Sequence, residues 1–143
     1  AVSATYPIAQ WEDQIISGIG SGSAVRVGDP INVEFAPRVG PALYPRNPVE
    51  LQFTGIISPG STGGRITFVL QRLSSGSWVI AAVFGFSYSG GIDIYPTWRG
   101  LDGIGWGINS LPNAQYRLMA YLQAGSGEVG IGSVTFTMRQ INK

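Results

Sequence analysis

The sequence predicts an all-β protein, an antiparallel two-sheet sandwich with a jelly-roll-like arrangement of about eight strands. Apolar and polar residues alternate with a period of two along five separate segments, which is typical of strands with one face on a core and one in water. Turn-forming residues separate these segments at roughly regular spacing, and the chain holds 21 glycines and 9 prolines among its 143 residues. These patterns favour one compact domain of short antiparallel strands.

The expected strands cover most of the chain, and turn signals bound each of them. They span residues 24–27, 31–36, 49–57, 65–73, 77–88, 92–95, 115–124 and 130–140. The apolar faces of the five alternating segments consist of Ile31, Val33 and Phe35; Val49, Leu51 and Phe53; Ile66, Phe68 and Leu70; Tyr116, Leu118, Ala120 and Leu122; and Val134, Phe136 and Met138. No helical periodicity runs past about two turns, and residues 8–16 hold the best helical pattern.

Residues 77–88 differ from the other expected strands because both of their faces are apolar. The even positions from Trp78 to Tyr88 are mostly large, and the odd positions from Val79 to Gly85 are small and apolar. Two covered faces indicate either a central strand of a sheet or a strand that meets another subunit.

Three stretches do not alternate and are expected to lie outside the strands. Residues 1–14 are predicted to form an extended N-terminal arm, which leaves residues 15–143 as a single β-sandwich domain. The arm is expected to lie either on another chain or back on its own sandwich. Residues 37–48 should form an extended loop, because each proline restricts its own φ and the conformation of the residue before it. Residues 96–112 are expected to form a glycine-rich loop.

The shortage of ionisable side chains excludes much of enzyme chemistry. Only 12% of the residues are charged, histidine and cysteine are absent, and the single lysine ends the chain. A catalytic triad lacks its usual base here, and thiolate nucleophiles or cysteine metal sites cannot be built. No clustered carboxylates and no phosphate-binding loop motif occur either. The sequence therefore predicts a non-enzymatic protein without a catalytic residue, metal or cofactor.

The charge pattern also limits the partners. A net charge of +1, with the arginines scattered along the chain, argues against a nucleic-acid partner, which would need a basic stripe. The same scatter argues against a basic patch for membranes, and no run approaches the ~18 apolar residues of a membrane span.

A surface with so little charge offers little repulsion between neighbouring molecules, so we expect other protein subunits to cover it. Large apolar groups outside the expected strands are the candidates for these contacts. They lie in the arm and in the two loops, and they are Tyr6, Trp11, Leu43, Tyr44, Trp98 and Trp106.

The glycine-rich loop supports an alternative, because exposed aromatic rings can stack on sugars. A possible ligand platform would consist of Tyr95, Trp98 and Trp106. Asp93 or Asp102 would then orient the sugar hydroxyls, as in a carbohydrate-binding module or a lectin-like fibre tip. The two acids could also form a hydrolytic carboxylate pair. The simpler interpretation places Asp93 on the polar face of a strand and Asp102 in an Asp-Gly turn.

The order of strands and turns resembles that of the small jelly-roll cement (decoration) proteins of tailed-phage capsids. The resemblance rests on the leading segment that ends at residues 23–28, on the strand and longer loop before residues 49–53, and on the closing segments 115–121 and 132–136. It covers most of the chain as a pattern of strands and turns, and it assigns no functional residue. It implies an oligomeric, non-catalytic structural protein that binds across capsomer boundaries on the exterior of the virion.

The resulting hypothesis is a structural protein of a symmetric assembly, a viral capsid cement or coat protein. Its partners would be further copies of itself and a major capsid protein. A glycan partner belongs to the alternative.

Overall fold

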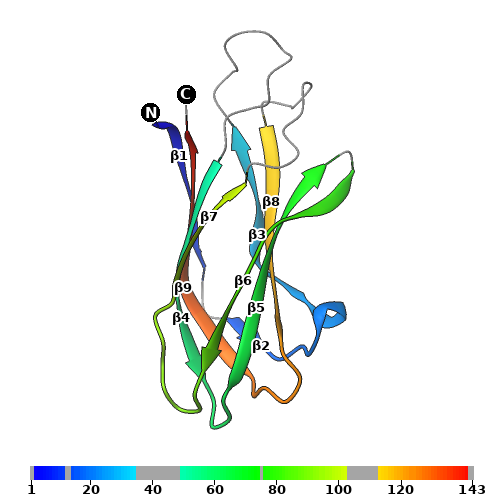
Figure 1. Cartoon of the computed structure of the whole chain (residues 1–143), viewed down its shortest axis with the longest axis vertical. Coiled ribbons are helices and arrows are strands. Elements are labelled where there is room, and N and C mark those ends of the chain that lie inside the picture. Colours follow the sequence, from blue (N-terminus) through cyan, green and yellow to red (C-terminus); the bar gives the residue numbers. More distant parts are fainter. Residues whose placement is uncertain (1, 12–13, 35–48, 75, 103–112, 142–143) are drawn as a thin grey trace.

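Two antiparallel β-sheets face each other along the long axis of the molecule in the computed structural model, which confirms the predicted sandwich (Figure 1). The structure describes residues 2–11, 14–34, 49–74, 76–102 and 113–141. The elements of this part of the chain are β1 (Val2–Trp11), β2 (Gln14–Ile16), the 3-10 turn η1 (Ser21–Ser23), β3 (Val25–Glu34), β4 (Val49–Pro59), β5 (Gly64–Ser74), β6 (Ser77–Tyr88), β7 (Thr97–Asp102), β8 (Asn113–Leu122) and β9 (Val129–Ile141).

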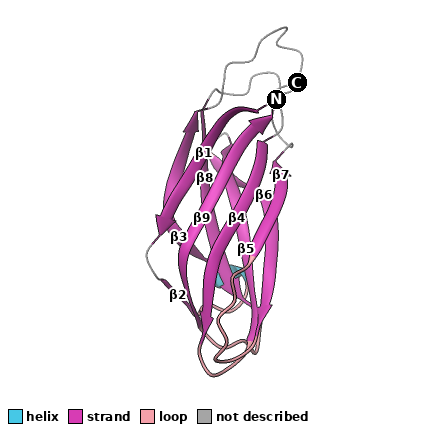
Figure 2. Ribbon diagram, turned by 90° about the vertical axis from the view of Figure 1, so that its left-hand side faces the viewer, coloured by secondary structure: helices cyan, strands magenta, loops and turns pink. Residues whose placement is uncertain are grey.

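The strand order within the sheets is that of a jelly roll. The first sheet runs β1-β9-β4-β7, with the short β2 also paired to β9, and the second runs β3-β8-β5-β6. The long strands form four antiparallel pairs, β1 with β9, β3 with β8, β4 with β7 and β5 with β6. A single ribbon of these pairs, folded over on itself, brings β9 against β4 and β8 against β5 and so produces the two sheets. Figure 2 shows the first sheet from its outer side.

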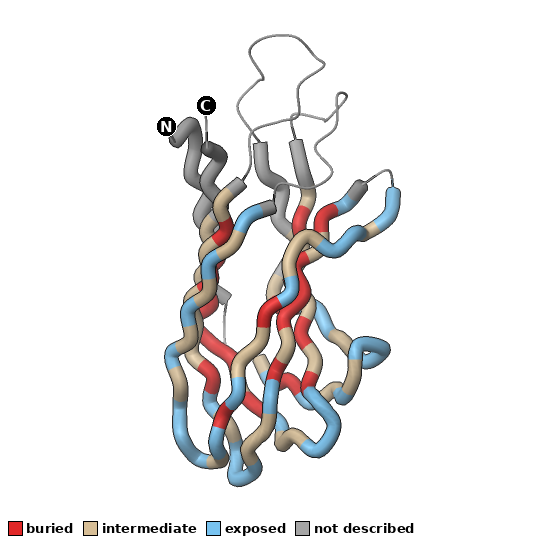
Figure 3. Tube along the Cα trace, viewed as in Figure 1, coloured by how far each residue is buried: buried red, intermediate tan, exposed pale blue. Residues whose placement is uncertain are grey.

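The core lies between the two sheets. Many of its residues are apolar residues of the alternating segments, which the sequence predicted to face inward. Alternate residues are buried there from Ile66 to Leu70 of β5 and from Tyr116 to Leu122 of β8, together with Leu51, Phe53 and Ile57 of β4 and Val134 and Phe136 of β9. Figure 3 shows the facing buried stretches in red. The largest fully buried side chains are Tyr116, Phe53, Phe68, Phe136, Ile16, Leu51, Ile57, Ile66, Leu70, Leu118 and Leu122. The period-two pattern therefore identified the inner faces correctly where burial is described. The predicted inward positions of Val49, Met138, Ile31, Val33 and Phe35 lie outside the side chains that the structure describes.

Two expected strand boundaries were wrong. The segments 24–27 and 31–36 belong to one strand, β3, whose register against β8 shifts between Val27 and Ile31, where glycine and proline interrupt the regular pairing. Residues 92–95 are not a strand, since Ile94 makes only an isolated bridge to Ile57. The strand lies instead at β7, inside the stretch that was expected to be a glycine-rich loop.

The N-terminal segment forms the strands β1 and β2, so the best helical pattern of the sequence, at residues 8–16, does not correspond to a helix in its described part. β1 pairs along β9 from Val2 opposite Ile141 to Trp11 opposite Val134. In this single chain the segment is thus extended and forms an edge of its own first sheet. Contact between this segment and a neighbouring subunit stays a prediction.

Three turns meet at the lower end of the sandwich in Figure 1, between β4 and β5, after β6, and between β8 and β9. Backbone hydrogen bonds join them: the N–H of Gly91 donates to the Gly60 carbonyl at 2.6 Å, and that of Gly127 donates to the Gly63 carbonyl at 3.1 Å. Tyr88 adds a side-chain bond, because its hydroxyl donates to the Gly127 carbonyl at 2.6 Å. The turns therefore hold one another in place through main-chain contacts.

Tyr88 should make stability depend on pH in the alkaline range. Burial raises the pKa of its hydroxyl above the ordinary value of 10.0, and a hydrogen bond with Ser126 lowers it by a smaller amount. The folded state therefore favours the protonated phenol, and this preference stabilises the fold. The stabilisation is fully present below pH 10.0, the ordinary pKa, and is lost as the pH rises through the higher pKa of the folded state. We expect Tyr88→Phe to cost about 0.5–1.5 kcal/mol at neutral pH, with the difference from the native chain shrinking in alkali. Urea unfolding over a pH series measures this, and a constant difference would contradict it.

Candidate functional site

β6 is one of the two edge strands of the second sheet, and its exposed apolar side chains include Val79, Ile80 and Val83. Within the described residues it pairs with β5 alone. The sequence left two interpretations open for residues 77–88. The interpretation as a central strand of the sheet is therefore wrong, and the interpretation as a strand that meets another subunit stays a prediction. None of its twelve residues is charged and none is proline, so it lacks two common devices that protect an edge from other chains.

A bulge in β6 brings a second apolar residue to the outer side. Phe84 faces the core, and Val83 faces outward opposite Val69. Leu70 then pairs with Ala82 and Gln71 with Ile80, so Ala81 has no partner and the alternation shifts by one residue. As a result both Ile80 and Val83 are exposed, at 63% and 54%.

The outer side chains of β5, β6 and β8 surround a hollow of about 340 Å³, which we call the outer hollow. Its lining includes Val69, Gln71, Ile80, Val83, Arg117 and Met119, and Ser21 and Ala24 close it near η1. In the sheet register Met119 of β8 lies beside Val69 of β5, which lies beside Val83 of β6. The hollow therefore has an apolar floor that runs across three strands.

Arg117 is the positive group of the outer hollow, and neutral groups hold it in place. Its Nε donates to Oε1 of Gln71 at 2.6 Å. Its guanidinium carbon lies 4.3 Å from the ring centre of Trp78, a distance typical of a cation–π contact. Neither Gln71 nor Trp78 is an anion, so neither of them neutralises the positive charge of Arg117. Arg26 of β3 follows next to Met119 in the register but does not line the hollow.

This arrangement suits the binding of an apolar group that carries a negative charge. No carboxylate stands among the described residues that line the hollow, so these residues offer no carboxylic general acid or base. Among the described residues no group of three or more potential metal ligands occurs. Nor does the described part of the chain contain a helix long and apolar enough to cross a membrane.

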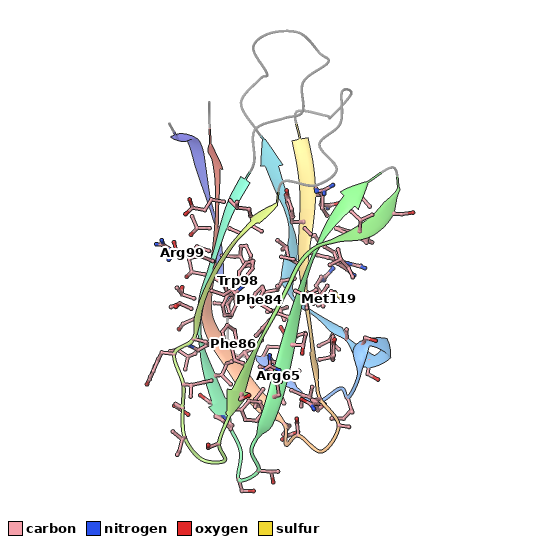
Figure 4. The ribbon with its side chains drawn as sticks, in the orientation of Figure 1. Arg65, Phe84, Phe86, Trp98, Arg99 and Met119 are labelled. Atoms are coloured by element: carbon pink, nitrogen blue, oxygen red, sulfur yellow. The ribbon has the colours of Figure 1, made fainter. Side chains whose placement is uncertain are left out.

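Trp98 lies in a strand and packs against the core, so its expected position in a glycine-rich loop was wrong. It faces inward opposite Phe53 in the pairing of β7 with β4. Its ring stacks on that of Phe84, with centroids 4.3 Å apart and planes at 9°. Figure 4 shows these two side chains next to each other between β7 and β6. One face of the indole is thus occupied within the chain. Its predicted roles in subunit contact and sugar stacking stay predictions.

The other predicted site residues are dispersed. Tyr95 is 71% exposed, and Asp93 is exposed on the same connection between β6 and β7. Tyr6 and Trp11 belong to β1, and Asp102 ends β7. Leu43, Tyr44 and Trp106 lie outside the described residues.

Sequence reasoning missed the outer hollow as a site. The apolar character of both faces of residues 77–88 was visible, and it did indicate contact with another subunit. Met119 and Val69 gave no such signal, because each stands alone on the polar face of an alternating segment. Only the pairing of β8, β5 and β6 places them side by side.

No protein-family model matches the sequence, and no curated protein matches it. Among solved structures, a chain from infectious bursal disease virus, Gx strain, is similar over 96% of this chain and 37% of the viral chain, at 10% identity and a TM-score of 0.53. The VP2 subviral particle of infectious bursal disease virus matches over the same shares of the two chains, at 11% identity and a TM-score of 0.43. This chain therefore spans little more than a third of the viral chains. The first match, together with the strand order, indicates that the chain shares a jelly-roll fold with a viral protein.

Proposed function

We propose that this protein is a non-enzymatic structural subunit of a symmetric assembly, and more specifically a viral coat or capsid decoration protein. The observation that carries the proposal is the uncharged edge strand β6 with its exposed apolar outer side. Such a surface on a chain with 12% charged residues favours coverage by other subunits.

The fold supports the same conclusion. Jelly rolls recur in viral capsid proteins, although the fold alone also occurs in lectins and cupins. The similar chain at a TM-score of 0.53 comes from a virus. A location on the exterior of the virion, with this chain and a major capsid protein as partners, follows from the proposal. Contact through Tyr6, Trp11, Leu43, Tyr44, Trp98 and Trp106 is part of it.

Light scattering of the purified protein over a concentration series tests the proposal. We expect a discrete oligomer or growth into larger particles, because the apolar outer side of β6 gains from burial at roughly 25 cal/mol per Å² before the costs of association. These oligomers should not dissociate at an ionic strength of about 1 M, since salt screens interactions between charges and not the burial of apolar surface.

A monomer at every concentration would contradict the proposal. It would favour the carbohydrate-binding alternative, for which the exposed ring of Tyr95 beside Asp93 is the feature that the structure offers.

A further inference from the structure

An exposed segment of the connection between β6 and β7 combines a negative charge with large apolar side chains. In the connection between β6 and β7, Ile92 is 59% exposed and Tyr95 is 71% exposed. Asp93 lies between them and is also exposed. Among the side chains that the structure describes, this is the stretch where two large apolar groups, each more than half exposed, flank an exposed carboxylate.

This segment and the outer hollow belong to different sides of the molecule. Ile94 anchors the segment by an isolated bridge to Ile57 of β4, where its N–H and carbonyl each bond to Ile57 at 2.9 Å. β4 is part of the first sheet, whereas the hollow lies on the outer side of the second. A chain therefore does not fill its own hollow with this segment.

We infer that the outer hollow of one copy receives the segment of residues 92–95 from a second copy. Ile92 and Tyr95 bury their apolar surface against Val69, Val83 and Met119. The Asp93 carboxylate approaches Arg117, whose contacts with Gln71 and Trp78 in the described part of the chain are contacts with neutral groups.

Charge and size both favour this occupant. The described lining of the hollow contains a cation and no acid, while residues 92–95 contain an acid and no cation. A volume of about 340 Å³ is at the lower end of the range of pockets that enclose a ligand, about 300–1,000 Å³. It therefore suits a few side chains from a short segment better than the flat face of another sheet.

The contact joins two different surfaces, so it is head-to-tail. Repetition of such a contact produces a closed ring when the rotation closes and an open filament when it does not. The inference rests on the proposed function, because it names the partner and surfaces through which the subunit assembles.

A charge exchange between two variants tests the inference. Asp93→Arg and Arg117→Glu should each weaken self-association at least about tenfold, because each places like charges in the contact. An equimolar mixture of the two variants should regain association to within about threefold of the native chain, since each hollow then meets a segment of opposite charge. Sedimentation velocity over a concentration series measures both effects.

Matched controls carry the same substitutions on other exposed groups. Glu128→Arg and Arg99→Glu should leave self-association unchanged, because neither residue belongs to the hollow or the segment. Thermal unfolding should show that all four variants fold. If Arg117→Glu does not fold, Val83→Ser replaces it, and weaker association is again expected because the hollow loses part of its apolar wall.

The outcomes separate this inference from the proposed function. If the native chain associates and the single variants associate equally well, the head-to-tail contact is wrong and the structural role stands. If the native chain stays monomeric at every concentration, both are wrong. Loss of association in each variant with no recovery in the mixture also overturns the contact, because the two charges would then not face each other.

Discussion

Phe53→Ala is expected to lower the free energy of unfolding by about 3–5 kcal/mol. Phe53 is 1% exposed and lies at the centre of the aromatic cluster of the core. Its ring centroid is 4.9 Å from that of Phe68, 5.1 Å from Phe84 and 5.8 Å from Phe86. Alanine would remove contacts to strands of both sheets and leave a cavity that the surrounding rings fill only in part. Urea unfolding followed by fluorescence measures the loss.

The matched control is Tyr95→Ala, which removes a ring of similar size that is 71% exposed. We expect it to change stability by less than about 0.5 kcal/mol at concentrations where the protein is monomeric. Equal losses in both variants would contradict the view that the Phe53 cluster joins the two sheets.

Gly90→Ala and Gly127→Ala are expected to destabilise the protein by about 1–3 kcal/mol each, because they overpack the turns at the lower end of the sandwich. A Cβ atom on Gly90 would collide with the backbone carbonyl oxygen of Ser61. One on Gly127 would lie 2.6 Å from Cβ of Thr62 and 2.7 Å from its carbonyl oxygen. The obstacles are largely main-chain atoms, which cannot turn aside as a side chain can. Thermal unfolding of the two variants measures the effect.

Gly22→Ala is the control for these glycines, because no atom lies within 4 Å of a Cβ built there. It should leave stability unchanged or raise it slightly, since alanine restricts the unfolded chain more than glycine does. Equal melting temperatures for Gly90→Ala and Gly22→Ala would mean that the turns can move apart, against the expected result.

The residues of the core were readable from the sequence because burial imposes a local pattern. In β5, Ile66, Phe68 and Leu70 are fully buried and Thr67 is partly exposed, whereas Val69, at 9% exposed, is an exception to the alternation. A strand with one face on the core must place its apolar residues two apart, and this requirement does not depend on which strand lies beside it. The same argument holds for Leu51 and Phe53 of β4.

The sequence did not predict β1 and β7 as strands, because their residues do not alternate regularly between apolar and polar. β7 contains a glycine and two charged residues within six positions, so its sequence resembles a turn. It is a strand because β4 offers a free edge, against which Trp98 lies opposite Phe53. β1 likewise extends along β9 despite a proline in its middle. Propensity alone argues against both segments, and pairing with a neighbour outweighs it.

By itself the sequence determined the all-β class, the inner residues of most strands, the lack of the usual catalytic bases and thiols, and the unusual apolar character of residues 77–88. Each of these follows from residue types and from spacing along the chain. The tertiary structure decided the jelly-roll order, the position of β6 at an edge and the outer hollow across β5, β6 and β8. These depend on which strands pair, and pairing joins residues far apart in the chain, such as Val69 with Met119, whose proximity no local pattern encodes.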